Sequence, residues 1–164
     1  MQRVRPVDER DHDLLVRAVA LAREALDQGH EPFGTLLVGE RGTVLVEDHN
    51  RVGGGDATQH PELTVARWAA SHLEPAERAR ATVYTSGEHC PMCSAAHAWV
   101  GVGRIVYAAS TAQLGRWRAE WGVDAGPVAP LPIGAVAPDL EVSGPDPALT
   151  EEVRALHARS LGVH

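Results

Sequence analysis

The two cysteines of this 164-residue chain stand three positions apart, in the tetrapeptide Cys90-Pro91-Met92-Cys93. Thirty residues before Cys90 comes a histidine followed by proline and glutamate, His60-Pro61-Glu62. One imidazole and two thiolates form a three-ligand set that is typical of zinc with a fourth coordination position left open. We therefore expect His60, Cys90 and Cys93 to bind one Zn²⁺ per chain, within a fold that holds these side chains together.

Both motifs consist of a candidate ligand followed by proline. Proline is favoured at the first position of a helix, so the sequence predicts that His60 and Cys90 are the N-caps of two helices. The positive end of a helix dipole favours thiolate over thiol, and the i, i+3 spacing lets both cysteines reach one ion. The two helices must then start at a common point, as they do where parallel strand–helix units gather at one edge of a sheet.

The open zinc position predicts hydrolytic chemistry. Zinc can lower the pKa of a bound water from about 15.7 to about 7, which corresponds to roughly 12 kcal/mol of help in forming hydroxide. A positioned general base contributes about 3–5 kcal/mol more. Glu62, two residues after His60, is placed to carry the water proton to a substrate ring nitrogen and then to a leaving group. The pattern indicates attack by zinc hydroxide on an sp² carbon that bears an amine.

Composition narrows the class of protein. A length of 164 residues, with 44% apolar residues, is typical of one globular domain. The net charge of −7 argues against a nucleic-acid backbone or an anionic membrane as the main partner. The segment 1–13 is polar, and no apolar run is long enough to span a bilayer. We expect a soluble cytoplasmic protein with no membrane partner.

Hydrophobic periodicity and turn residues predict an alternation of strands and helices. A hairpin comes first and crossover helices follow, which is typical of an α/β layered domain. We expect a single domain over 1–164, with a core at about 10–125 and a proline-rich segment and C-terminal helix at 126–164. The predicted helices are at 7–29, 60–73, 90–100, 112–121 and 146–161, and the predicted strands at 33–38, 43–46, 82–86 and 104–109, with an edge strand at 140–142.

The two motifs together resemble those of the zinc-dependent nucleobase and cytidine deaminase superfamily. Further matches over about residues 10–115 resemble the bacterial branch that contains guanine, cytosine and tRNA adenosine deaminases. The resemblance implies an α/β three-layer sandwich, with a five-stranded mixed sheet and helices on both faces, and it implies a homodimer. The residues that carry these further matches are Pro32-Phe33-Gly34, His49-Asn50-Arg51, Asp56-Ala57-Thr58, Glu88 and Arg104–Ala108.

By motif position, the resemblance implies the zinc ligands already named, with Glu62 as the proton shuttle and Asn50 as the residue that holds a polar edge of the base. Two residues depart from the family pattern. His89 stands where the family usually has proline, and Pro61 stands where many members have a small residue whose backbone N–H can donate to the substrate. Proline cannot donate, so we expect base recognition, rather than the zinc chemistry, to differ.

Several of these residues also have a structural interpretation. Asn50 can stabilise a turn, Phe33 can belong to the core rather than pack over a flat base, and His89 can be a loop histidine rather than a substrate contact. His97, one helical turn past Cys93, is expected to be a core histidine. Trp117 and Trp121 are expected in the core or at a subunit interface, and Trp68 and Trp99 in structural positions.

The sequence thus predicts a hydrolytic deaminase that acts on a free nucleobase or nucleoside and releases ammonia. Guanine-like, cytosine-like and aminotriazine-like rings all present a suitable carbon. A tRNA adenosine deaminase is the alternative within the family, although the chain has no basic stripe for a polyanion. Two alternatives from other classes are a zinc-stabilised, non-catalytic binding module and a thiol redox protein that uses Cys90 and Cys93.

Overall fold

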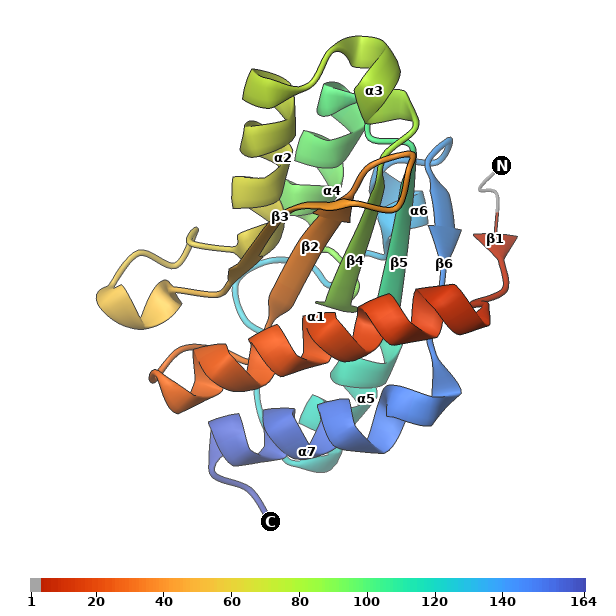
Figure 1. Cartoon of the computed structure of the whole chain (residues 1–164). Helices are drawn as coiled ribbons and strands as arrows, with labels where there is room; N and C mark the ends of the chain where they lie inside the picture. The colour runs from red at the N-terminus through yellow and green to blue at the C-terminus, as the bar shows by residue number, and fades with distance from the viewer. Residues whose placement is uncertain (1–3) are drawn as a thin grey trace.

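The computed structural model describes residues 4–164 and contains one mixed β-sheet with helices packed on both faces (Figure 1). The six strands lie in the order β1-β6-β5-β4-β2-β3. The hairpin β2–β3 is antiparallel, β2 also pairs antiparallel with β4, and the remaining neighbours are parallel. The strands are β1 (Val4–Arg5), β2 (Gly34–Val38), β3 (Val44–His49), β4 (Thr82–Gly87), β5 (Arg104–Ala109) and β6 (Glu141–Ser143).

Two hydrophobic cores, one on each side of the sheet, define three layers. Helices α1, α5 and α7 contribute to the first core, and α2, α4 and α6 lie over the second. The predicted α/β three-layer sandwich is therefore confirmed. The helices are α1 (Glu9–Asp27), α2 (Pro61–His72), α3 (Pro75–Ala79), α4 (Pro91–Val100), α5 (Thr111–Glu120), α6 (Ile133–Val136) and α7 (Thr150–Leu161), with short 3₁₀ turns at Val52–Gly54 and Pro147–Leu149.

The sheet has one strand more than the five that the sequence predicts. The additional strand, β1, is two residues long and pairs Val4 with Val142. Such a short strand shows no alternation of apolar and polar residues, and its partner is far away in the sequence. The prediction that this segment forms an edge strand is wrong, because β6 pairs with β5 on one side and with β1 on the other. The first three residues of the predicted domain lie outside the described residues.

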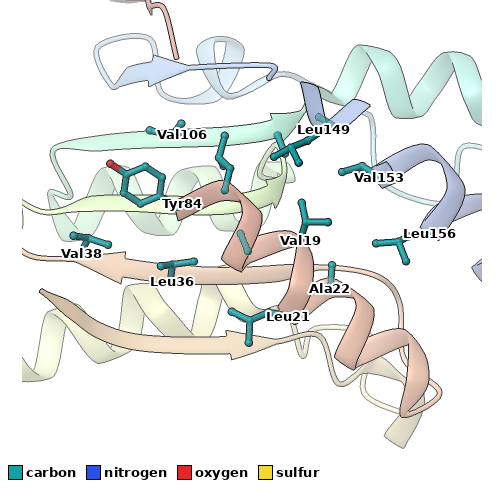
Figure 2. Close-up of a cluster of buried hydrophobic side chains, with 14 of the residues drawn as sticks. Val19, Leu21, Ala22, Leu36, Val38, Tyr84, Val106, Leu149, Val153 and Leu156 are labelled. Atoms are coloured by element: carbon teal, nitrogen blue, oxygen red, sulfur yellow. The ribbon is translucent and has the colours of Figure 1, made fainter. Parts of the chain in front are cut away.

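Close packing of α1 on the sheet forms the first core. Figure 2 shows Val19 and Ala22 of α1 beside Leu156 of α7, and Leu36 of β2 belongs to the same core. A Cβ atom at Gly34 would lie 2.3 Å from the carbonyl oxygen of Ala18, so only glycine lets α1 approach the start of β2 this closely.

Among the described residues, none of the helices has the length and apolar content needed to cross a bilayer.

The tryptophans divide between core and surface. Trp117 is buried in the first core and Trp68 is half-buried against the second, as expected. The expectation of a structural position is wrong for Trp99, which is 87% exposed. The buried residues of α4 are Cys93, Ser94 and His97. Trp99 lies two positions beyond His97, about 200° further round the helix, and so points away from the sheet.

The strand directions bring the candidate site residues to one edge of the sheet. Strand β2 runs opposite to β3 and β4, so its first residue lies beside the last residues of these two strands. Phe33 precedes β2, Asn50 follows β3, and the segment 88–90 follows β4. The backbone N–H of Asn50 donates to the carbonyl of Phe33 at 3.0 Å, which closes this edge.

A buried charged network ties α1 to the sheet. The carboxylate of Asp11 accepts two hydrogen bonds from Arg104, at 2.9 and 2.8 Å, and one from the hydroxyl of Tyr84 at 3.0 Å. Burial opposes ionisation of Asp11, but these hydrogen bonds and the charge of Arg104 outweigh it and hold the pKa of Asp11 below its ordinary value. Arg104 also donates to Ser143 of β6 at 2.6 Å.

We predict that Asp11→Asn lowers the free energy of unfolding at pH 7 by about 3 kcal/mol, because it leaves Arg104 buried without its carboxylate. A carboxyl group whose pKa is lowered by folding stabilises above its unfolded pKa, and this contribution is lost as the pH falls. The difference from the wild type should therefore shrink below about pH 4, where Asp11 begins to be protonated in the unfolded chain. Urea unfolding of the wild type and the variant at pH 7 and pH 3 measures this difference in the free energy of unfolding.

Tyr84→Phe is the matched control, since it removes one neutral donor to Asp11 and leaves the ion pair with Arg104 intact. Tyr84→Phe should lower the free energy of unfolding by about 1 kcal/mol. An Asp11→Asn defect of equal size at both pH values would contradict this account of the network.

Candidate active site

Two helix N-termini meet at this edge of the sheet. His60 is the N-cap of α2, Cys90 is the N-cap of α4, and both helices begin with proline, as the sequence predicts. Neither His60 nor Cys90 accepts a capping hydrogen bond on its side chain. Both side chains therefore remain available as ligands.

The three candidate ligands form one cluster with the dimensions of a zinc site. The ligand atoms of His60, Cys90 and Cys93 all lie within 4.8 Å of one another. His60 Nδ1 is 3.5 Å from Cys90 Sγ and 3.7 Å from Cys93 Sγ. Tetrahedral zinc with ordinary Zn–S and Zn–N bonds separates a sulfur and a nitrogen ligand by about 3.6 Å. The donor set and its spacing fit zinc.

The electrostatics of the cluster make one of its three ligands an anion. Hydrogen bonds from Cys93 and His60, opposed by burial, lower the pKa of Cys90 to about 4, so this residue is a thiolate at neutral pH. The same hydrogen bond to Cys90, together with burial, raises the pKa of Cys93. The imidazole of His60 lies near both sulfurs and completes a three-ligand set that a dithiol pair alone does not have.

Glu62 lies beside the cluster and is only 4% exposed. Its Oε2 is 3.9 Å from Cys93 Sγ, and its Oε1 is 3.3 Å from the hydroxyl oxygen of Thr85. Burial is the main cause that raises the pKa of Glu62 to about 7. A carboxyl group with such a pKa can both accept and release a proton near neutral pH.

Thr85 is a site residue that the sequence analysis did not identify. It is fully buried at the carboxyl end of β4, where its hydroxyl lies between Glu62 and Thr35 of β2. A signal was present, because Thr85 and Ser86 are polar residues at the end of a buried strand. Their contacts depend on the pairing of β2 with β4, which periodicity does not predict.

Asn50 has the turn-stabilising role considered for it. It is 1% exposed, and its Oδ1 accepts a hydrogen bond from the backbone N–H of Val52 at 3.0 Å. This contact stabilises the turn after β3 and fixes the orientation of the side-chain amide. The amide nitrogen is the group that is left to meet a ligand.

Phe33 forms one wall of a small pocket at this edge. The pocket is also lined by Gly87, Glu88 and Leu114, and by His157 of the C-terminal helix. The rings of Phe33 and His157 meet edge to face, with centroids 5.1 Å apart. A Cβ atom at Gly87 would lie 3.0 Å from the Phe33 ring, so a larger residue there would push the ring back. His157 is the second residue that the sequence analysis missed, because nothing in its own helix marks it.

His89 and Glu88, in the turn after β4, are engaged within the protein. His89 is fully buried, and its ring packs edge to face on His97 with centroids 4.3 Å apart. The carboxylate of Glu88 accepts the backbone N–H groups of Thr111 and Ile133, both at 2.8 Å. Glu88 therefore fixes the turn that carries Cys90 to the starts of α5 and α6.

Comparison with known proteins identifies the family. Residues 8–109 match the family described as the cytidine and deoxycytidylate deaminase zinc-binding region. The chain belongs to this family, and it is accordingly a zinc-dependent deaminase, an enzyme that hydrolyses a carbon–nitrogen bond. The match includes all three candidate metal ligands and Glu62, and it confirms the resemblance seen in the two motifs.

Two curated relatives are nucleobase deaminases. The chain is 33% identical over 145 residues to a probable cytosine deaminase of Schizosaccharomyces pombe, which covers 85% of this chain and 86% of that protein. It is 38% identical over 97 residues to a guanine deaminase of Bacillus subtilis, which covers 58% of this chain and 62% of that protein.

The fold has a counterpart among solved structures. A guanine deaminase from Nitrosomonas europaea matches with a TM-score of 0.67 and 21% identity, over 98% of this chain and 87% of that one. At this identity the likeness concerns the fold, and it extends through the proline-rich segment and α7.

We predict that Cys90→Ala and His60→Ala each lose bound metal and stability together, because metal binding and folding are coupled. A ligand at about 1,000 times its dissociation constant stabilises a protein by about 4 kcal/mol, and the two variants should lose this contribution. Metal analysis by mass spectrometry and thermal unfolding with and without a chelator measure both effects. Met92→Ala, which lies between the two cysteines, is the control and should retain metal. A Cys90→Ala protein with full zinc content would contradict the assignment.

Proposed function

We propose that this protein is a deaminase of a free nucleobase or nucleoside with a guanine-, cytosine- or aminotriazine-like ring, and that residues 1–164 act as one domain in the cytoplasm. One observation carries the proposal: the buried carboxylate of Glu62 lies 3.9 Å from a sulfur of the His60, Cys90 and Cys93 cluster. A non-catalytic binding module has no use for a buried carboxyl group whose pKa is raised to about 7.

Glu62 is the proposed proton shuttle. When bound, one zinc ion per chain would supply an activated water by lowering its pKa. In the proposed reaction, Glu62 moves one proton of the attacking water to a ring nitrogen of the substrate while the water oxygen forms a bond to the carbon that bears the amine. Glu62 would then move the second proton of that oxygen to the amine nitrogen, and the carbon–nitrogen bond breaks to release ammonia and leave a carbonyl group. Thr85 holds the carboxylate by its Oε1.

Three further residues are proposed to contact the base. Asn50 offers its side-chain amide nitrogen to a polar edge of the ring, and Phe33 offers an aromatic face. His89 lies directly before Cys90, where its buried ring would shape the bottom of the pocket rather than reach into solvent. Because Pro61 has no N–H, the first turn of α2 provides no backbone donor at this position.

The charge of the chain favours a small substrate over tRNA. A tRNA adenosine deaminase must hold a polyanion, whereas this chain carries 15 basic and 22 acidic residues. The cytosine deaminase relative, matched over 85% of the chain, also supports a free base. The tRNA anticodon stem remains the alternative substrate.

An ammonia-release screen tests the proposal. The zinc-loaded protein is incubated with free bases, nucleosides, aminotriazines and a tRNA anticodon stem. We expect release from at least one free base or nucleoside and none from the stem. Release from the stem alone would replace the proposal by the tRNA alternative, and binding of a base without release would favour the non-catalytic module.

We predict that Glu62→Gln lowers turnover by at least the 10²–10⁴-fold that general acid–base catalysis contributes. Zinc content should stay near one per chain, because Glu62 is not one of the three ligands. Glu151→Gln, an exposed glutamate at the start of α7, is the matched control and should keep wild-type turnover. Loss of zinc together with activity in Glu62→Gln would contradict the shuttle role.

We propose in addition that the chain forms a homodimer through the outer face of α4. Dimers are implied by the family resemblance, and this face carries the 87% exposed ring of Trp99. Light scattering after gel filtration should show a dimer for the wild type and a monomer for Trp99→Glu. Val16→Glu, an exposed apolar position on α1 at the opposite face of the sheet, should remain dimeric. A wild-type monomer at micromolar concentration would exclude this interface.

A further inference from the structure

His97 joins the two helices that carry the active-site cluster. It lies on α4, one turn after Cys93, and is fully buried. Its Nε2 is 2.8 Å from the backbone carbonyl oxygen of Glu62 on α2. A carbonyl can only accept, so Nε2 carries the proton and donates.

The carbonyl of Glu62 can accept this bond without leaving the helix. A carbonyl oxygen has two lone pairs, so it can accept from the imidazole as well as from an amide of the next helical turn. Burial lowers the pKa of His97 to about 4, so the ring is neutral at pH 7. The bond is therefore a neutral hydrogen bond that closes the gap between α2 and α4 behind the site.

This bond connects the two helices that carry the site residues, so it affects the geometry of the site. Each of the two helices supplies part of the site: His60 and Glu62 come from α2, and Cys90 and Cys93 come from α4. The bond from His97 reaches the backbone of the one residue whose side chain is the proposed shuttle. A shift of α2 along α4 would change the distance of 3.9 Å between the Glu62 carboxylate and Cys93 Sγ.

The surroundings of His97 hold its ring in this orientation. The His89 ring packs edge to face on it at 4.3 Å. In the described part of the chain, the second nitrogen of His97 and both ring nitrogens of His89 have no hydrogen-bond partner. Burying such polar atoms costs free energy that an aliphatic side chain would avoid. The contact with Glu62 is what His97 provides and an aliphatic residue would not.

We propose that His97 is a positioning residue, whose Nε2–H holds the first turn of α2 against α4 and thereby fixes the Glu62 carboxylate relative to the metal cluster. This inference rests on the proposed shuttle role of Glu62. A displacement of about 1 Å of a catalytic group can reduce the rate about 100-fold. The proposed substrate contacts of Asn50 and Phe33 come from the ends of β3 and β2 and do not depend on this bond.

The test compares two substitutions of His97 with a packing control. His97→Leu fills the space but removes the donor, whereas His97→Gln keeps an N–H donor at about the same distance along the side chain. Ile105 is a fully buried residue of β5 in the second core, over which α4 lies. Ile105→Ala should lower stability without removing the bond from His97. The steady-state parameters, zinc content and melting temperature of all three zinc-loaded proteins are measured at pH 7.

We expect His97→Leu to lower kcat about 10–100-fold, with KM changed less than threefold and zinc near one per chain. His97→Gln should recover kcat to within about fivefold of the wild type. Ile105→Ala should keep wild-type kcat at temperatures below its melting transition. Equal kcat in His97→Leu and Ile105→Ala, or no recovery in His97→Gln, would overturn the proposal.

Hydrogen–deuterium exchange separates this inference from the proposed function. Exchange of the backbone amides at the start of α2 should be faster in His97→Leu than in the wild type, and close to wild type in His97→Gln. Unchanged exchange in His97→Leu would overturn the proposed positioning role of His97, whatever the activity of the variant. A wild type that releases no ammonia from any substrate would instead refute the proposed function, while the exchange experiment still decides whether the bond holds α2.

Discussion

The approach of two helix N-termini at one edge of the sheet is the constraint on which the rest of the site depends. His60 on α2 and the two cysteines on α4 come from different strand–helix connections, and they meet because β3 and β4, which flank β2, end at the same edge of the sheet. The sequence spacing within each motif sets the local geometry. The sheet sets the distance between the motifs, which is why a 3.5 Å contact can join residues thirty positions apart.

The pKa values of two acids in this site are shifted in opposite directions. Hydrogen bonds to Cys90 lower its pKa to about 4, whereas burial raises the pKa of Glu62 to about 7. One group is thereby kept as a permanent anion suited to binding a cation, and the other is kept close to its point of half-protonation. Such a divergence of neighbouring pKa values is the usual sign of divided roles in an active site.

Much of this arrangement could be predicted from the sequence, because its determinants are local. Proline after each candidate ligand specifies a helix start, and the strands at 82–86 and 104–109 follow from their β-branched and aromatic content. The contacts that were missed are non-local. Thr85 of β4 meets Glu62 of α2, His157 reaches Phe33 from the far end of the chain, and β1 is too short to show a pattern. The exposure of Trp99 depends on which face of α4 the sheet covers.

The pairing of β1 with β6 has a consequence for the order in which the chain can fold. These strands join Val4 to Val142, so β1 has no partner until residue 142 has been synthesised. The residues around the proposed metal site lie between 33 and 93 and are connected by much shorter loops. Because long loops are slow to close, the metal-binding edge should assemble before the sheet is completed at its opposite side. A nascent chain would thus present His60, Cys90 and Cys93 to zinc before β6 is available to pair with β1.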